Sequence, residues 1–534
     1  MKIMFLGADH EVTGSCHHIQ VGEKNILLDY GMEQGRDTYE NQKLSINEAD
    51  IDYVFLSHAH IDHSGLIPLL YKNGFKGEIY TTEATYDLCK IMLRDSAHIQ
   101  EFEAQWRNRK AKRSGHELYE PLYSMDDAED VLEHFHECVY DEIINVCDEI
   151  KVRFVDVGHL LGSASIELWL TENGTTKKIV YSGDIGNINQ PIIDDPQYVE
   201  DGDFVIMEST YGNRFHGDMP DYVGELSRII QTTFDKGGNV VIPAFAVGRT
   251  QEMLYFIRKI KEEGLIKGHN DFKVYVDSPL AVEAINVFNE NIDNCFDEEA
   301  MELVRKGIDP ISFRGLRVAV SAEESQAINF DKDPKVILSA SGMCDAGRIR
   351  HHLKHNLWRP ESTILFVGYQ AVGSLGRILV DGGKQVKLFN EIINVRANIE
   401  KLDGISGHAD KKGLLKWINS FKSKPEKVFV VHGDDLVSEE FSECLRNEYR
   451  YDVYCPFSGA IYDLSTNTVI KDGTKVPIEH KDRSQAARRN SDVYVNLENA
   501  VSRLDRLVND NKGKTNAEIE KLVIAINRLC DKFS

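Results

Sequence analysis

The segment that most constrains this chain spans residues 57–63 and has the sequence SHAHIDH. It directly follows the apolar, β-rich run Tyr53 to Leu56, which predicts a buried strand, and it precedes a predicted helix that begins near Leu66. A loop between a strand and a helix is held at both ends and can still wrap around a cation. The chain must therefore fold so that a buried strand ends at a loop rich in metal-binding side chains.

Four metal-binding side chains occupy this loop: His58, His60, Asp62 and His63. His58 and His60 can converge on one ion, while Asp62 and His63 can turn towards a second. Imidazole and carboxylate ligands without thiolate are typical of zinc, or a similar divalent ion, in a catalytic rather than a structural site. Simple packing explains the loop poorly, because each buried imidazole would need its own hydrogen-bond partner.

Residues of the same chemistry recur where later predicted strands end. They are His159, Asp184, Glu208, His408 and His432. Because the strands of one sheet end at a shared edge, we expect these side chains to converge on the loop 57–63. Asp29 ends an earlier predicted strand, and its carboxylate either orients a ligating histidine or caps a turn.

The region from about 213 to 390 has a different pattern, in which predicted strands alternate with predicted helices. This alternation indicates a parallel α/β module, and the strand-end histidines beyond it indicate that the module is inserted into the first domain. Glycine-rich turns in the module carry three arginines and two serines, which form either phosphate cradles or ordinary tight turns with surface arginines. These residues are Arg249, Ser341, Arg348, Ser374 and Arg377.

Length and composition narrow the possible classes of protein. A chain of 534 residues is too long for one hydrophobic core, so more than one domain is expected. There is no long apolar run typical of a membrane span and no signal-peptide pattern, and the nine cysteines include no Cys-x-x-Cys pair. These features predict a cytoplasmic protein with reduced thiols and no membrane partner.

The net charge of −24 disfavours non-specific attraction to nucleic acid or to an anionic membrane. Binding of a nucleic acid would have to be confined to a local cleft, and it would be weak and strongly salt-sensitive. The tail carries a polar linker and two predicted amphipathic helices, which either pack on the body or associate into a homo-oligomer. The predicted divisions are 1–212 and 391–465 for the two parts of the first domain, 213–390 for the insertion, and 466–534 for the tail.

With these residues assembled, the chain resembles the metallo-β-lactamase fold and, within it, the β-CASP nucleases. Asp29, the loop 57–63, His159 and Asp184 match the motifs of the fold, and the three strand-end residues that remain match the additional β-CASP motifs. The resemblance covers about 1–465. It implies an αββα sandwich with an inserted β-CASP α/β domain, followed here by a short helical C-terminal extension. Segments 207–212 and 368–371 look most like the RNA-processing members, related to the endonuclease subunit of the polyadenylation machinery.

The resemblance also implies two Zn²⁺ ions and a role for each site residue. One ion would be held by His58, His60 and His159, the other by Asp62, His63 and His432, with Asp184 between them. Asp62 and Asp184 would therefore act at the reacting centre, where a metal-activated water attacks the substrate.

The resemblance implies that His408, oriented by Glu208, is the general acid. The implied activity is a zinc-dependent ribonuclease that hydrolyses single-stranded RNA, as an endonuclease, a 5′-to-3′ exonuclease or both. A DNA nuclease, a hydrolase of another anionic ester and a catalytically silent scaffold are the alternatives.

Overall fold

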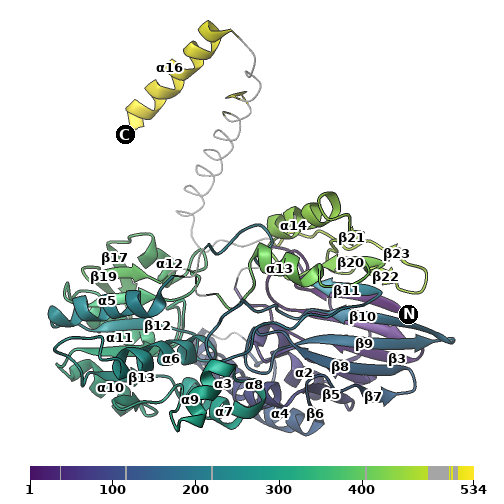
Figure 1. The fold of residues 1–534 in the computed structure, drawn as a ribbon, viewed down its shortest axis with the longest axis horizontal. Coiled ribbons are helices and arrows are strands. Elements are labelled where there is room, and N and C mark those ends of the chain that lie inside the picture. Colours follow the sequence, from purple (N-terminus) through teal and green to yellow (C-terminus); the bar gives the residue numbers. More distant parts are fainter. Residues whose placement is uncertain are drawn as a thin grey trace. The chain divides into compact units, whose positions relative to one another are not determined.

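A computed structural model gives the architecture of the chain (Figure 1). It divides into two units, Met1–Val476 and Pro477–Ser534, which are described separately. The residues that the structure describes are 1–35, 38–114, 117–217, 220–402, 404, 406–478, 504, 507–508 and 515–533.

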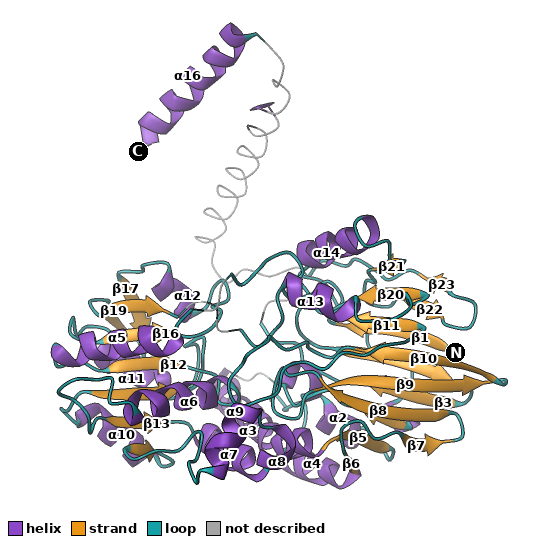
Figure 2. Cartoon of the chain, in the orientation of Figure 1, coloured by secondary structure: helices purple, strands orange, loops and turns teal. Residues whose placement is uncertain are grey.

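Two mixed β-sheets form one part of the first unit, on the right in Figure 2. Apolar side chains of both sheets, such as Phe5 and Ile26 from one and Phe154 and Ile166 from the other, belong to one buried cluster. In strand order, the first sheet is β23 (Thr468–Lys471), β22 (Ile461–Asp463), β1 (Lys2–Gly7), β2 (Cys16–Val21), β3 (Lys24–Leu28), β4 (Tyr53–Phe55), β5 (Glu78–Thr82) and β6 (Phe135–Cys138). The second is β21 (Val453–Tyr454), β20 (Lys427–Val430), β11 (Phe204–Met207), β10 (Thr175–Tyr181), β9 (Ala164–Glu172), β8 (Ile150–Asp156) and β7 (Ile144–Cys147).

Helices pack against the outer face of each sheet. Leu88 and Leu93 of α3 share a buried cluster with Leu27 and Val54 of the first sheet. On the second sheet, α13 and α14 bury Trp417, Phe441 and other apolar residues against β11 and β20. The order of layers is thus αββα, and the predicted fold class is confirmed. The helices concerned are α1 (Ile61–Ser64), α2 (Ile67–Lys72), α3 (Glu83–Ser114), α4 (Met125–Asp130), α13 (Lys411–Ile418) and α14 (Asp435–Asn447).

A third, wholly parallel sheet is inserted between β11 and β20, which are themselves hydrogen-bonded neighbours. The inserted module is therefore confirmed, although its boundaries at 213 and 390 stay a prediction; β19 extends this sheet to Lys401. The strand order is β14 (Leu316–Val318), β13 (Lys273–Val276), β15 (Lys335–Ser339), β12 (Val240–Pro243), β16 (Thr363–Phe366) and β19 (Asn398–Lys401). Its helices are α5 (Tyr222–Asp235), α6 (Arg249–Glu262), α7 (Pro279–Glu290), α8 (Ile292–Cys295), α9 (Glu298–Arg305), α10 (Ala322–Phe330), α11 (Ile349–Asn356) and α12 (Leu375–Val380), and a hairpin of β17 (Gln385–Leu388) and β18 (Glu391–Asn394) follows α12.

The sequence pattern from about Thr82 to Ile150, with its long acidic runs, predicts helices throughout, and this prediction is correct only in its first part. Helices α3 and α4 lie there, but β6 and β7 follow them. Strand β6 pairs in parallel with β5, and β7 pairs with β8, so each lies at the edge of one sheet. Pairing with a preformed strand outweighed the weak local preference of this polar segment.

In the second unit, the predicted last helix is confirmed as α16 (Asn516–Phe533). The predicted preceding helix lies mostly outside the described residues, and self-association of the tail stays a prediction. Within the described ranges, no helix has both the length and the apolar character needed to cross a membrane.

Candidate metal centre

The predicted ligands all lie at strand ends of the two facing sheets. The chain leaves β4 at Phe55 and presents His58 and His60 before α1, whose first turn carries Asp62 and His63. The remaining ligands follow β8, β10 and β20 respectively, and they are His159, Asp184 and His432. Residues more than 370 positions apart in the sequence thus meet at one edge of the sandwich.

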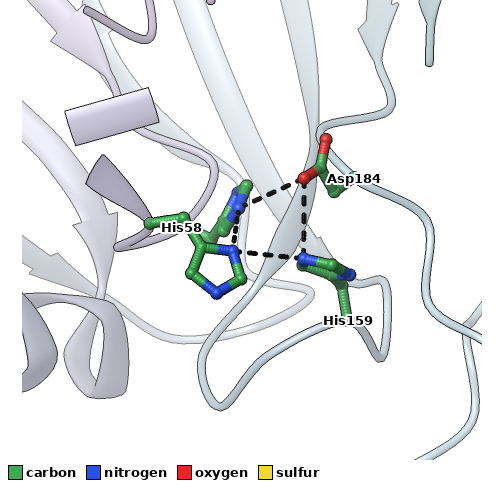
Figure 3. A group of neighbouring side chains, drawn as sticks. His58, His159 and Asp184 are labelled. Atoms are coloured by element: carbon green, nitrogen blue, oxygen red, sulfur yellow. Dashed lines mark hydrogen bonds and ion pairs between the residues drawn. The ribbon is translucent and has the colours of Figure 1, made fainter. Parts of the chain in front are cut away.

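The first cluster consists of His58, His60, His159 and Asp184 (Figure 3). His60 Nδ1 lies 3.0 Å from His58 Nε2 and 3.2 Å from His159 Nε2. Asp184 Oδ2 lies 3.5 Å from each of these two Nε2 atoms. Three nitrogens and one oxygen therefore surround a single point.

The second cluster consists of Asp62, His63 and His432. The Nε2 atoms of His63 and His432 are 3.2 Å apart, and Asp62 Oδ2 lies 3.9 Å from the first and 3.7 Å from the second. Asp184 Oδ1 lies 3.4 Å from His63 Nε2. One oxygen of Asp184 thus faces each cluster, so this carboxylate stands between them.

Hydrogen bonds on the outer side fix the ring nitrogens of four histidines. His63 Nδ1 donates to Asp29 Oδ2 at 2.7 Å, which is the orienting contact expected as one of two possibilities for Asp29. Each remaining Nδ1 has a single acceptor: Ser57 Oγ for His58 at 3.0 Å, the Gly407 carbonyl for His159 at 3.1 Å, and Thr210 Oγ1 for His432 at 3.1 Å. With Nδ1 protonated, the Nε2 lone pair of each ring points inward.

This arrangement fits a divalent metal ion in each cluster. Lone pairs that face one another at 3.0–3.2 Å repel unless a proton or a metal ion lies between them. Ligands bound to tetrahedral zinc at the usual bond lengths are about 3.3 Å apart, close to these separations. Asp184 Oδ1 is buried and accepts no hydrogen bond within the described part of the chain. The two groups therefore have the composition and spacing of metal-binding sites.

The charges of three of these residues, His58, His159 and Asp184, suit the same role. Burial, reinforced by neighbouring histidines, holds the pKa of His58 and His159 well below the ordinary value, so both rings are neutral. Burial alone would raise the pKa of Asp184, but His432, His63 and His408 hold it well below the ordinary range. Neutral imidazoles and an ionised carboxylate are the forms that bind a metal.

His408 and Glu208 form a separate pair beside this centre. His408 Nδ1 lies 3.3 Å from Glu208 Oε1 and 4.0 Å from Asp184 Oδ2. Burial lowers the pKa of His408, yet the carboxylates of Glu208 and Asp184 outweigh burial and raise it to about 9. The side chain of His408 remains 23% exposed, so a protonated imidazole faces the solvent side of the centre.

Comparison with known proteins identifies the family. Three family models match the chain: the metallo-β-lactamase superfamily over residues 11–228, the Beta-Casp domain over 250–379, and the Zn-dependent metallo-hydrolase RNA specificity domain over 392–456. Ribonuclease TTHA0252 of Thermus thermophilus is 34% identical over 82% of this chain and 94% of its own length. The chain belongs to the β-CASP branch of the metallo-β-lactamase superfamily.

Two further relatives are similar to this chain over most of its length. An RNase J-like protein of Methanocaldococcus jannaschii is 31% identical over 86% of this chain and 99% of its own length. The transcription termination factor FttA of the same organism is 30% identical over 86% of this chain and 71% of its own. The predicted family is confirmed, and the chain is a metal-dependent hydrolase by membership.

The structure brings together the predicted ligands of this β-CASP protein, whereas each predicted phosphate-binding arginine pairs with a carboxylate of the protein itself. Arg348 donates to buried Asp277 at 2.8 Å and to two backbone carbonyls, while Arg249 pairs with Glu252 and Arg377 with Asp381. Ser341 contacts the Ala346 carbonyl at 3.5 Å, and Ser374 caps α12. These partners account for the position of the Arg348 side chain without a bound phosphate. A role of Arg348 in substrate binding stays a prediction, as do the roles of the other four residues.

Some contributors were missed from the sequence. Ser57, Thr210 and the Gly407 carbonyl form hydrogen bonds with the rings of predicted ligands. Ser57 and Gly407 directly precede predicted site residues, and Thr210 lies two positions after Glu208. Proximity in sequence was the available signal. Which neighbour faces a ring depends on how the loops cross, so the sequence alone gave no means of choosing them.

Proposed function

We propose that this β-CASP protein is a zinc-dependent ribonuclease that hydrolyses phosphodiester bonds of single-stranded RNA at a centre of two Zn²⁺ ions. The observation that carries the proposal is the Asp184 carboxylate, which lies between two ligand clusters and 4.0 Å from His408. The match to an RNA specificity domain and the names of the relatives support RNA as the substrate. Those relatives and the reduced cysteines support a cytoplasmic location.

The residues of the site have different roles in the proposed reaction. Metal ions bound here supply Lewis acidity, which lowers the pKa of a water molecule to about 7 and offsets charge on phosphate oxygens. The residues that would hold the ions are His58, His60, His159, Asp62, His63, His432 and Asp184. Their outer hydrogen-bond partners keep the rings in place, so little reorganisation is needed during the reaction.

His408 donates a proton to the leaving oxygen of the ribose. The neighbouring Glu208 carboxylate raises the pKa of the imidazole and so favours its protonated form, which a general acid needs. Glu208 is itself fixed, since its carboxylate accepts the backbone N–H groups of Ile185 and Thr210. It positions the ring and does not touch the substrate.

Exposed aromatic side chains of the inserted module support binding of a single strand. Phe245 is 49% exposed and Tyr369 is 55% exposed, in the loops that follow β12 and β16. Gly342, in the loop after β15, joins these two loops. It lies against the Phe245 ring, and the Gly342 carbonyl accepts a hydrogen bond from Gln370 Nε2 at 3.0 Å. Rings of this kind stack on bases without regard to sequence. Stacking requires little positive charge, which suits a protein of net charge −24.

Cleavage of end-labelled single-stranded RNA, with DNA of matched sequence beside it, tests the proposal. We expect zinc-loaded wild-type protein to cut RNA, and chelation to abolish cleavage. His408→Ala should lower the rate by about 10²- to 10⁴-fold, the contribution of a general acid. His136→Ala is the matched control, since His136 is a half-exposed histidine on β6 that pairs with Glu78.

The products distinguish the remaining possibilities. Internal fragments indicate endonuclease action, and mononucleotides from the 5′ end indicate exonuclease action. Faster cleavage of DNA than RNA would contradict the substrate assignment. A zinc-loaded protein that cuts neither would overturn the proposal in favour of another ester substrate or a scaffold.

A further inference from the structure

A second group of metal-binding side chains lies outside the catalytic centre. It consists of His10, Glu439 and Cys455, whose ligand atoms all lie within 4.8 Å of one another. His10 lies in the loop between β1 and β2, Glu439 on α14, and Cys455 directly after β21. None of the three belongs to the family motifs quoted for this chain, and Cys455 supplies a thiol, which both catalytic clusters lack.

The His10 ring is positioned as a metal ligand. It is 1% exposed and stacks on Phe457, with ring centroids 3.6 Å apart and planes 3° from parallel. Burial lowers the pKa of His10, so the ring is neutral. Its Nδ1 donates to Asp435 Oδ1 at 2.8 Å, which leaves the Nε2 lone pair facing Cys455 Sγ at 3.5 Å. A histidine fixed by a carboxylate in this way is the common arrangement at zinc sites.

Asp9 is a further buried acid near this cluster, and burial, followed by the charge of Glu11, raises its pKa well above the ordinary range. It is 1% exposed, and neither of its carboxylate oxygens has a hydrogen-bond partner within the described residues. It lies beside the cluster, because its charge is among the causes that raise the pKa of Cys455. A buried carboxylate without partners is costly unless a proton or a cation compensates it.

A nucleophilic Cys–His–Asp triad is the alternative use of these residues, and the surrounding charge opposes it. Burial, followed by the carboxylates of Glu439 and Asp9, raises the pKa of the Cys455 thiol to about 12. A reactive cysteine needs the opposite environment, one that favours the thiolate. A divalent cation would stabilise the thiolate and the nearby carboxylates together.

We propose that His10, Glu439 and Cys455 form a further binding site for a borderline-soft divalent cation of the zinc class, separate from the catalytic centre and independent of the nuclease proposal. Zinc binds this combination of imidazole, thiolate and carboxylate. The site would also brace the catalytic centre. The loop that carries His10 accepts the backbone N–H of His432 at the Ala8 carbonyl (2.7 Å) and that of Gly433 at the Glu11 carbonyl (2.9 Å).

Cobalt substitution tests the site without an activity assay. Full-length protein is kept reduced and reconstituted with Co²⁺, and the metal content and near-ultraviolet absorption are measured. We expect a thiolate-to-cobalt charge-transfer band, which ligands of histidine and aspartate cannot produce. Cys455→Ser should lose this band and one equivalent of metal. Cys147→Ser, which removes another half-buried cysteine outside the cluster, should keep both.

A second variant guards against misfolding. Asp435→Asn weakens the partner of His10, which also binds Tyr39 and Lys475. The Asp435 side chain is 35% exposed, so the fold should persist. We expect the affinity of the thiolate site to fall about 10- to 100-fold in this variant. Absence of the band in wild type, or equal metal content in wild type and Cys455→Ser, would overturn the proposal whether or not the protein cuts RNA.

Discussion

Replacement of Asp29 by asparagine tests how the outer hydrogen bonds control the metal centre. Asp29 is fully buried, and four donors point at its carboxylate. Oδ1 accepts Ser57 N at 2.7 Å, while Oδ2 accepts Ser57 Oγ at 2.8 Å and both His63 Nδ1 and Tyr181 Oη at 2.7 Å. Asparagine has nearly the same shape and tolerates the left-handed backbone here, where φ is 56°.

The expected losses of stability and of metal affinity follow from the number of acceptor oxygens that the side chain keeps. An asparagine keeps one oxygen, and it satisfies most donors if this oxygen takes the place of Oδ2. The amide NH₂ then faces the Ser57 N–H, a buried donor that loses its acceptor, at a cost of about 1–3 kcal/mol. His63 also loses the carboxylate that fixes its ring, which should weaken metal binding about 10- to 100-fold. That loss corresponds to about 1.4–2.7 kcal/mol.

Two measurements separate these effects. Zinc affinity is measured by competition with a chromophoric chelator, and the unfolding of the metal-free protein is measured separately. Asp50→Asn, at an exposed aspartate, is the matched control and should change neither. Unchanged zinc affinity in Asp29→Asn would refute the orienting role. Unchanged affinity with lower stability would instead assign Asp29 as a turn cap.

Two further predictions concern stability. Burial raises the pKa of Asp156 to about 7, so the folded protein holds a proton that the unfolded chain releases near pH 4. The stability due to this proton is present below pH 4 and is lost as the pH rises to 7, by about 1.4 kcal/mol per pH unit. In urea unfolding at pH 5, 6 and 7, Asp156→Asn should lack this slope, and parallel profiles would contradict the assignment. Arg348→Ala should lower the free energy of unfolding by about 1–3 kcal/mol, because buried Asp277 loses one charged partner and keeps His352 and Ser325. Arg377→Ala, at an exposed pair, should change it by less than about 1 kcal/mol, and similar values for the two variants would show that Arg348 is not structural.

The local pattern of the sequence was sufficient to locate most strands and the candidate ligands. Buried runs such as 53–56 and 335–339 are short, β-branched and bounded by polar turns, so they form strands in the structure. A metal ligand must also follow such a strand closely to be held rigidly, which is why His58 and Asp184 were recognisable from the sequence. The strands β6 and β7 were not recognisable, because their stability comes from partners distant in the chain.

Only the tertiary structure decided how these residues face one another. It turned Arg348 inward to Asp277, gave one oxygen of Asp184 to each ligand cluster, and brought His10 beside Cys455, which lies 445 positions later in the sequence. The physical reason is that a side chain's partner depends on the crossing of loops that are remote in sequence. Local propensity determines where a strand ends, whereas packing determines what its last residue meets.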